Sequence, residues 1–249
     1  MKKIFTTMVA VVSIFLLAAC GKTEKKEITI SAAASLNEVL SQIAENYQKE
    51  NKNITVNINF GASGALKKQI EGGAPVDFVF FASKKDLEDL KKQNLVSEKF
   101  SKDIFENTMV VAGRKKIDDL SEMLDHKVAI GDPDIVPAGR YAKQVLENAG
   151  LWDRMQENFV LSKDVRSAMQ YVDLYEVDYA MIYKTDSRVM KNAEIVYEVP
   201  NTLHTPIIYS CGILKDKERD EVKDFYKFLT NKDSIDIFEK FGFKVINEQ

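Results

Sequence analysis

Cysteine and histidine are scarce in this chain, with two of each among 249 residues. Cys20 and Cys211 are too few to build the disulfide framework that stabilises small secreted folds. His126 and His204 lie far apart and belong to no recognisable motif, so neither has the context of a catalytic base. Metal sites that combine histidine and cysteine at ligand spacing are therefore excluded.

Motifs of enzymes are also missing. The chain contains no G-x-S-x-G, S-x-x-K or H-E-x-x-H string and no Gly-rich phosphate loop. Ser63 stands in the string GASG, which is not the nucleophile elbow of a hydrolase. An exported serine hydrolase using Ser63 remains the weaker alternative, and it requires a base within hydrogen-bond reach of this serine. The prediction is that the chain is not an enzyme.

An excess of positive charge is absent. The chain has 35 lysines and arginines against 38 acidic residues, a net charge of −3. Loss of residues 1–19 changes this to −5, because Lys2 and Lys3 are removed and no acidic residue is. An acidic protein has no electrostatic footprint for nucleic acid, so no nucleic-acid partner is expected. Its overall field does not attract anions either, so any anion site must be built locally.

The N-terminal apolar run is short. Residues 8–19 are apolar apart from Ser13 and follow two lysines, the layout of a secretory signal peptide. About a dozen residues are too few to span a bilayer, which needs about 20. The string LAAC at 17–20 resembles the lipobox of bacterial lipoproteins. This resemblance implies a signal peptide over 1–19, lipidation of Cys20, a polar tether over 20–27, and export to the extracytoplasmic face of the cell membrane.

Strand and helix signals alternate through the rest of the chain, which predicts an α/β fold with mostly parallel sheets. Ser35 and Glu38 fit a capping box at the start of the first helix. The expected strands are 27–34, 54–60, 78–81, 109–112, 128–130, 159–161, 178–183, 195–199 and 207–214. The expected helices begin at 35 and after 64 and continue with 86–92, 141–148, 165–172, 218–229 and 234–241.

Small and hydroxyl residues gather where strands lead into helices. In open α/β sheets, ligands bind beyond the carboxyl ends of the strands, against helix N-termini. Several such N-termini that converge make an anion site without a charged side chain, because their first N–H groups have no partner within the helix. The four junctions of this kind are AAS at 33–35, GASG at 61–64, VPAG at 136–139 and KDV at 163–165.

At these junctions the sequence resembles the molybdate-binding proteins of bacterial ABC importers, along nearly the whole chain after the tether. The resemblance implies a type II periplasmic-binding-protein fold: two lobes of mostly parallel sheet flanked by helices, with two hinge crossings near 112 and 205. The lobes would be 28–110 with 207–249, and 111–206. The matching strings are AAASL at 32–36, FGASGAL at 60–66, QIEGGAPVD at 69–77, AIGDPDIVPAGRYAKQVL at 129–146, DVRSAMQYV at 164–172 and AMIYKTDS at 180–187.

The resemblance also implies a monomer that closes on its anion and docks on the membrane subunits of the importer, without a cofactor. Phe81 stands where the family usually has a serine, so it is expected to affect the neighbouring contact and the pocket size. Arg166 is expected to form a salt bridge that holds the cleft, and Asp132, Asp134 and Asp186 to cap helices or shape loops. Position by position, the binding residues implied are Ser35, Ser63, Ala82, Ala138, Val165 and Tyr183.

The residue types suit the ligand. A tetrahedral dianion offers only acceptors, and backbone N–H groups and the hydroxyls of serine and tyrosine are uncharged donors. Phosphate that keeps a proton near neutral pH needs an acceptor, and none of the implied contact residues is acidic. Molybdate and tungstate nearly coincide in size and charge and are not separated here. A protein that binds another oxyanion such as sulfate, or that senses rather than transports, is the second alternative.

Overall fold

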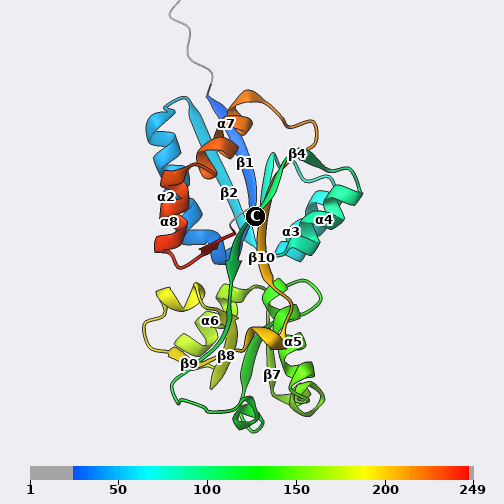
Figure 1. The fold of residues 1–249 in the computed structure, drawn as a ribbon, viewed down its shortest axis with the longest axis vertical. Helices are drawn as coiled ribbons and strands as arrows, with labels where there is room; N and C mark the ends of the chain where they lie inside the picture. Colours follow the sequence, from blue (N-terminus) through cyan, green and yellow to red (C-terminus); the bar gives the residue numbers. More distant parts are fainter. Residues whose placement is uncertain (1–24, 247–249) are drawn as a thin grey trace, which may run out of the picture.

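The computed structural model describes residues 25–246, which form two lobes stacked along the long axis (Figure 1). The predicted signal peptide and Cys20 lie outside the described residues. The first lobe has a six-stranded sheet in the order β11-β4-β10-β3-β1-β2. Its strands are β1 (Lys26–Ala33), β2 (Ile54–Gly61), β3 (Phe78–Phe81), β4 (Val96–Asn107), β10 (Ile207–Leu214) and β11 (Lys244–Val245). Its helices are α2 (Asn37–Glu50), α3 (Ser63–Glu71), α4 (Lys84–Lys92), α7 (Asp220–Leu229) and α8 (Lys232–Lys240), and a short 3-10 turn, η1 (Ala34–Leu36), precedes α2.

The second lobe has a five-stranded sheet in the order β7-β6-β8-β5-β9, flanked by two helices (Figure 1). Its strands are β5 (Met109–Gly113), β6 (Val128–Gly131), β7 (Phe159–Ser162), β8 (Tyr179–Tyr183) and β9 (Glu194–Glu198). Its helices are α5 (Pro137–Asn148) and α6 (Val165–Asp173), and 3-10 turns η2 (Leu120–Met123), η3 (Trp152–Asn158), η4 (Asp186–Val189) and η5 (Asn201–Leu203) fill the connections. No helix in the part of the chain from 25 to 246 is long and apolar enough to cross a membrane.

Both sheets are mixed, which corrects the expectation of mostly parallel sheets. β1 pairs in parallel with β2 and β3, and β6 pairs in parallel with β7 and β8. The strands that carry the chain between the lobes, β4, β5 and β10, pair antiparallel with their neighbours. The reversal arises because the chain leaves or re-enters each sheet along these strands instead of returning through a helix.

The first crossing lies at Thr108, between β4 and β5, and not near Ala112. Met109 and Val110 already pair with β8 in the second sheet, so the division of the chain comes two residues before the expected boundary. Ala112 lies inside β5 and pairs with Ala180. The second crossing runs over 199–206, between β9 and β10.

Two local expectations are wrong. β4 is a strand of 12 residues that the sequence pattern does not predict, and it lies between β10 and β11. The tether was expected to extend to Glu27, but Lys26 and Glu27 already pair with Ile54 and Thr55 as the first rungs of β1. The ladder with β2 fixes these two residues although their side chains are exposed.

β3 separates the two halves of the first lobe's core. Phe78 and Phe80 lie against α7 and α8 on one face, where their rings contact Phe225 and Phe238. Successive residues of a strand point to opposite faces. Phe81 therefore packs on the other face, in a cluster with residues of α3 and α4, and it is fully buried.

Candidate anion-binding pocket between the lobes

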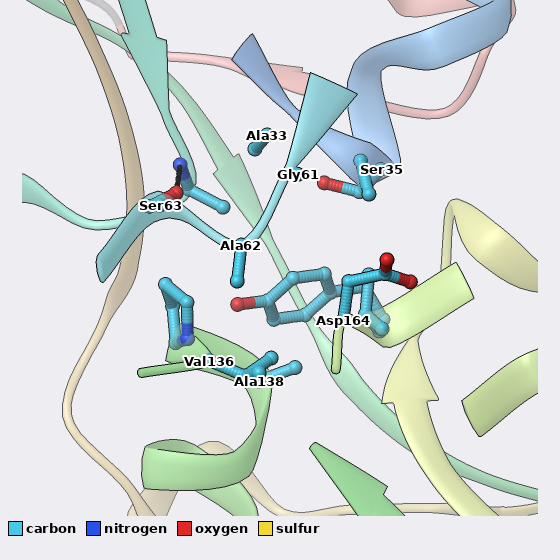
Figure 2. Close-up of a pocket in the computed structure, with 13 residues that line it drawn as sticks. Ala33, Ser35, Gly61, Ala62, Ser63, Val136, Ala138 and Asp164 are labelled. Carbon is cyan, nitrogen blue, oxygen red and sulfur yellow. Dashed lines mark hydrogen bonds between the residues drawn. The ribbon is translucent and has the colours of Figure 1, made fainter. Parts of the chain in front are cut away.

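One pocket lies where the two lobes meet, and all four predicted strand-to-helix junctions contribute to it (Figure 2). The six residues implied by the resemblance all line this pocket. The cavity is about 10 Å³, roughly the volume of one water-sized sphere. It therefore has room for a small ion and not for a larger metabolite. The lining consists of Ala33, Ala34, Ser35, Gly61, Ala62, Ser63, Ala82, Val136, Pro137, Ala138, Asp164, Val165 and Tyr183.

Three α-helices begin at the pocket. α3 begins at Ser63, α5 at Pro137 and α6 at Val165. Neither α3 nor α5 has a side-chain cap, so their first N–H groups have no partner from a capping residue. The N–H groups of the first turn have no acceptor within their own helix, and the positive end of the helix dipole lies beside them. The pocket thus has a local positive potential from uncharged groups.

Two serine hydroxyls face the pocket from the first lobe, and each already accepts or shares a hydrogen bond. The Oγ atom of Ser63 accepts from the N–H of Ala82 at 3.0 Å. The Oγ atom of Ser35 lies 2.7 Å from the phenol oxygen of Tyr209. The capping box predicted for Ser35 is wrong: the N-cap of α2 is Leu36, and no side chain caps the helix. The 3-10 turn η1 moves Ser35 off the capping position and into the pocket wall.

Tyr183 brings a third hydroxyl, from the end of β8 in the second lobe. It is 1% exposed, and its phenol oxygen has no hydrogen-bond partner. Burial raises the pKa of Tyr183 well above its usual value, so the hydroxyl keeps its proton. An unpaired buried hydroxyl is costly, by about 1–3 kcal/mol. A ligand that accepts a hydrogen bond from Tyr183 would remove this cost.

The one charged residue of the lining is Asp164, which the resemblance did not assign. Its carboxylate accepts from the N–H of Ser167 at 2.8 Å and so caps α6. Asp132 accepts from the N–H of Asp134 at 3.0 Å, which is the loop-shaping role expected for it. In the part of the chain that the structure describes, no group of three or more histidine, cysteine or acidic residues could hold a metal ion.

Direct contacts join the lobes on both sides of the pocket. Arg166 of α6 binds the carboxylate of Glu38 on α2, with Nη1 3.1 Å from Oε1. This is the salt bridge across the cleft that the sequence predicts for Arg166. On the other side, Arg140 of α5 binds the buried carboxylate of Asp86 on α4. Next to the pocket-lining residues Ser63 and Val136, the N–H of Gly64 donates to the carbonyl oxygen of Ile135 at 3.0 Å. The lobes are closed around the pocket.

Asp186 supports Arg166 from inside the second lobe. Its Oδ1 atom lies 2.7 Å from Nε of Arg166 as an ion pair, although the geometry is not that of a hydrogen bond. Burial raises the pKa of Asp186 to about 6, while the nearby Arg166 favours the ionised form. The native state therefore binds this proton more tightly than the unfolded chain, whose aspartates titrate near 3.8.

Replacing Asp186 with asparagine is expected to remove a pH-dependent loss of stability. As the pH rises from about 4 to 6, the wild-type native state gives up the Asp186 proton after the unfolded chain has lost it, at a cost of about 3 kcal/mol. Above pH 6 that cost is complete, and the amide of Asp186→Asn never incurs it. Melting temperatures measured without anion from pH 4 to 8 should rise for the variant relative to the wild type up to about pH 6 and stay level above it. A difference independent of pH would contradict this assignment.

Phe81 does not line the pocket, which corrects the expectation that it affects the pocket's size. Its ring packs among α3 and α4, and only Ala82, the next residue, reaches the cavity. Three residues beside Ser35 escaped the sequence reasoning: Asn107, Thr185 and Tyr209. Asn107 and Tyr209 occur in strings without a motif, and Thr185 lies within the matching string AMIYKTDS without an assigned role. Only the meeting of these residues in space connects them to the site.

Comparisons with known proteins agree with this geometry. Residues 28–244 match the model of the bacterial extracellular solute-binding protein family. A protein of Bacillus subtilis (strain 168), named provisionally as an ABC transporter substrate-binding lipoprotein, is 38% identical over 98% of this chain and 99% of its own length. The molybdate-binding protein of Haemophilus influenzae is 31% identical over 87% of this chain and 89% of its own.

A solved structure shows the same two-lobed fold. It is the substrate-binding domain of a provisionally assigned molybdenum ABC transporter from Clostridium difficile, with a TM-score of 0.68 and 32% identity over 89% of this chain and 99% of that one. These relatives are named as binding proteins, in agreement with the prediction that the chain is not an enzyme. The hydroxyl of Ser63 also has no side-chain base bonded to it among the described residues. The chain belongs to the family of bacterial extracellular solute-binding proteins and has the type II periplasmic-binding-protein fold.

Proposed function

We propose that this protein captures molybdate, or the similar tungstate, in the pocket between its lobes and delivers it to the membrane subunits of an ABC importer. The observation that carries the proposal is the set of uncharged donors in the pocket: helix N-termini, two serine hydroxyls and the unpaired hydroxyl of Tyr183. The one carboxylate of the lining, that of Asp164, caps α6. The names of relatives in Haemophilus influenzae and Clostridium difficile support the choice of anion. The roles of Ser35, Ser63, Ala82, Ala138, Val165 and Tyr183 as ligand contacts are part of this proposal.

The chemistry of the pocket supports a fully ionised tetrahedral anion. Each hydrogen bond to an ionised partner contributes about 1.5–3 kcal/mol, so a cage of several donors supports tight binding after the cost of ordering. Donors come from both lobes, Ser35 and Ser63 from one and Ala138, Val165 and Tyr183 from the other. The anion then stabilises the closed arrangement, because only that arrangement presents all donors at once.

Thermal melting with a panel of anions tests the proposal. A ligand at 100 times its dissociation constant stabilises the native state by about 2.7 kcal/mol, which raises the melting temperature measurably. We expect molybdate and tungstate to raise it and phosphate to leave it unchanged. A rise with sulfate alone would replace the proposed anion by sulfate, the second candidate, because sulfate satisfies the same uncharged donors. No rise with any of the four anions would contradict the proposed function.

We further propose that the mature protein is a monomer held at the extracytoplasmic face of the membrane by a lipid on Cys20. The LAAC string and the name of the Bacillus subtilis relative support the anchor. Mass spectrometry of the N-terminus after expression in a bacterial host checks it. We expect cleavage before Cys20 and a diacylglycerol on its thiol, and we expect Cys20→Ser to leave the protein unlipidated.

A further inference from the structure

A buried chain of hydrogen bonds leads from the hinge to Ser35. The amide nitrogen of Asn107, at the end of β4, lies 2.8 Å from Oγ1 of Thr185 and 3.3 Å from the phenol oxygen of Tyr209. The same phenol oxygen lies 2.7 Å from Oγ of Ser35. All four side chains are buried, and Thr185 belongs to the second lobe. The chain thus connects the pocket wall, the first crossing and the opposite lobe.

The direction of these hydrogen bonds follows from Asn107. Its Oδ1 atom accepts from the N–H of Thr108 at 2.9 Å, so the other end of the amide is the NH₂ group, which only donates. The phenol oxygen of Tyr209 must therefore accept from Asn107. Burial raises the pKa of Tyr209 well above its usual value, so its hydrogen is retained. That hydrogen has one described acceptor, Oγ of Ser35, and any other direction would leave it buried and unpaired.

Ser35 is then an acceptor toward Tyr209, and its own hydrogen is left for the anion pocket, one of two cavities that Ser35 lines. Ser63 is in the same state, since its Oγ accepts from the N–H of Ala82. A serine whose hydroxyl instead donated to Tyr209 would offer lone pairs to the pocket. Such lone pairs would repel a full dianion and accept from an anion that keeps a proton.

We propose that Tyr209 and Asn107 are positioning residues that fix the Ser35 hydroxyl as a donor into the pocket and thereby favour fully deprotonated oxyanions over protonated ones. This inference rests on the proposed function, because it concerns the selectivity of the same pocket. Tyr209 and Asn107 do not line the pocket and act through Ser35. The chain of hydrogen bonds from Asn107 through Tyr209 to Ser35, called the relay below, also links the pocket to the first crossing between the lobes, because Asn107 immediately precedes Thr108.

A double-mutant cycle tests whether Tyr209 acts through Ser35. Molybdate is titrated calorimetrically into the mature wild type, Ser35→Ala, Tyr209→Phe and the double variant. We expect each single variant to bind about tenfold or more weakly. We expect the double variant to match Ser35→Ala within about twofold, because contacts in one network are not additive. If the affinity losses of the two single variants multiplied in the double variant, the relay would be overturned.

The variant Asn107→Asp gives a second test of the inference, and this test does not require Tyr209→Phe to fold. A carboxylate at this position only accepts, so the Tyr209 hydrogen turns to it and Ser35 no longer receives a donor. At a slightly alkaline pH phosphate is mainly a dianion that keeps one proton, so the added negative charge weakens molybdate and phosphate to a similar extent. Competition of excess phosphate against molybdate gives the ratio of the two affinities, which removes that common effect. We expect the ratio to fall at least tenfold, and an unchanged ratio would overturn the inference.

Tyr47→Phe is the matched control. Tyr47 is a buried tyrosine of the same lobe whose hydroxyl donates to the carbonyl oxygen of Glu221, away from the pocket. Its removal should leave the molybdate affinity and the anion ratio as in the wild type, and a changed ratio would contradict the inference. A wild type that binds none of the four oxyanions would overturn the proposed function itself. A wild type that binds molybdate, with additive variants, would overturn the relay alone.

Discussion

Substitution of Gly64 by alanine is expected to weaken anion binding at least a hundredfold while the unliganded protein stays folded. A Cβ atom on Gly64 would lie 2.5 Å from the carbonyl oxygen of Ile135, a backbone atom of the other lobe. The lobes must then stay further apart, and the anion loses two or more hydrogen bonds of about 1.5–3 kcal/mol each. Within α3 itself alanine is preferred to glycine by about 1 kcal/mol, so the first lobe should not be destabilised.

Two other glycines serve as comparisons in the same assay. Gly72, at the end of α3, has only ordinary contacts at 3.4 Å around an added Cβ, so Gly72→Ala should bind like the wild type. Gly139 would place a Cβ 2.0 Å from the carbonyl oxygen of Gly131 within one lobe, so Gly139→Ala should lower the melting temperature even without anion. Wild-type affinity in Gly64→Ala would mean that binding does not require the closed arrangement.

The apolar runs predict the buried strands well. Phe78–Phe81 and Ile207–Leu214 have the bounds expected from the sequence, because a strand covered on both faces is a continuous apolar run. The prediction misses β4 because this strand has no continuous apolar run. The middle of this strand, from Glu98 to Asp103, is charged and at most half-buried, so it carries no period of two. It forms because β10 and β11 pair with it, and strand formation depends on such neighbours more than on intrinsic preference.

The sequence predicts the part of the pocket that helix N-termini form at the strand-to-helix junctions. It does not predict the contacts between residues that are far apart in the chain. Small residues at the four junctions allow helix N-termini to approach one another, and this pattern is local in the sequence. Ser35 and Tyr209 are separated by 174 positions, and Asn107 and Thr185 by 78, so no local pattern connects them. Glu38 illustrates the same limit, because it satisfies a capping-box spacing yet binds Arg166 across the cleft.

Closure of the lobes also depends on charges that the pocket itself does not use. The ion pairs Arg166–Glu38 and Arg140–Asp86 lie outside the uncharged donor cage, one on each side of it. The Asp86 carboxylate is buried, so removal of Arg140 would be strongly destabilising, although the intact pair adds little net stability. The Glu38 side chain is 39% exposed, and such exposed pairs contribute only about 0–1 kcal/mol. On the proposed function, these pairs set the alignment of the two lobes, and the bound anion would supply the free energy that favours the closed form.

The double variant Ser63→Ala with Tyr183→Phe is expected to bind molybdate at least tenfold more weakly than the wild type while keeping the fold. Ser63 and Tyr183 line the pocket from opposite lobes, and each substitution removes one of the hydroxyl donors proposed for the anion. Hydrogen bonds to ionised partners contribute about 1.5–3 kcal/mol each, so the loss approaches a hundredfold or more if both act fully. Calorimetric titration measures it, and an unchanged affinity would refute the assignment of the site.

Tyr183→Phe alone should weaken molybdate binding without lowering the melting temperature of the protein. Without anion, the hydroxyl of Tyr183 is buried and unpaired, so its removal should leave the melting temperature equal or higher. Tyr47→Phe should do the reverse, because its hydroxyl has an acceptor in Glu221 at 3.2 Å and lies away from the pocket: a lower melting temperature with unchanged affinity. If Tyr183→Phe also lowered the melting temperature and kept its affinity, the Tyr183 hydroxyl would be a structural group and not a ligand of the anion.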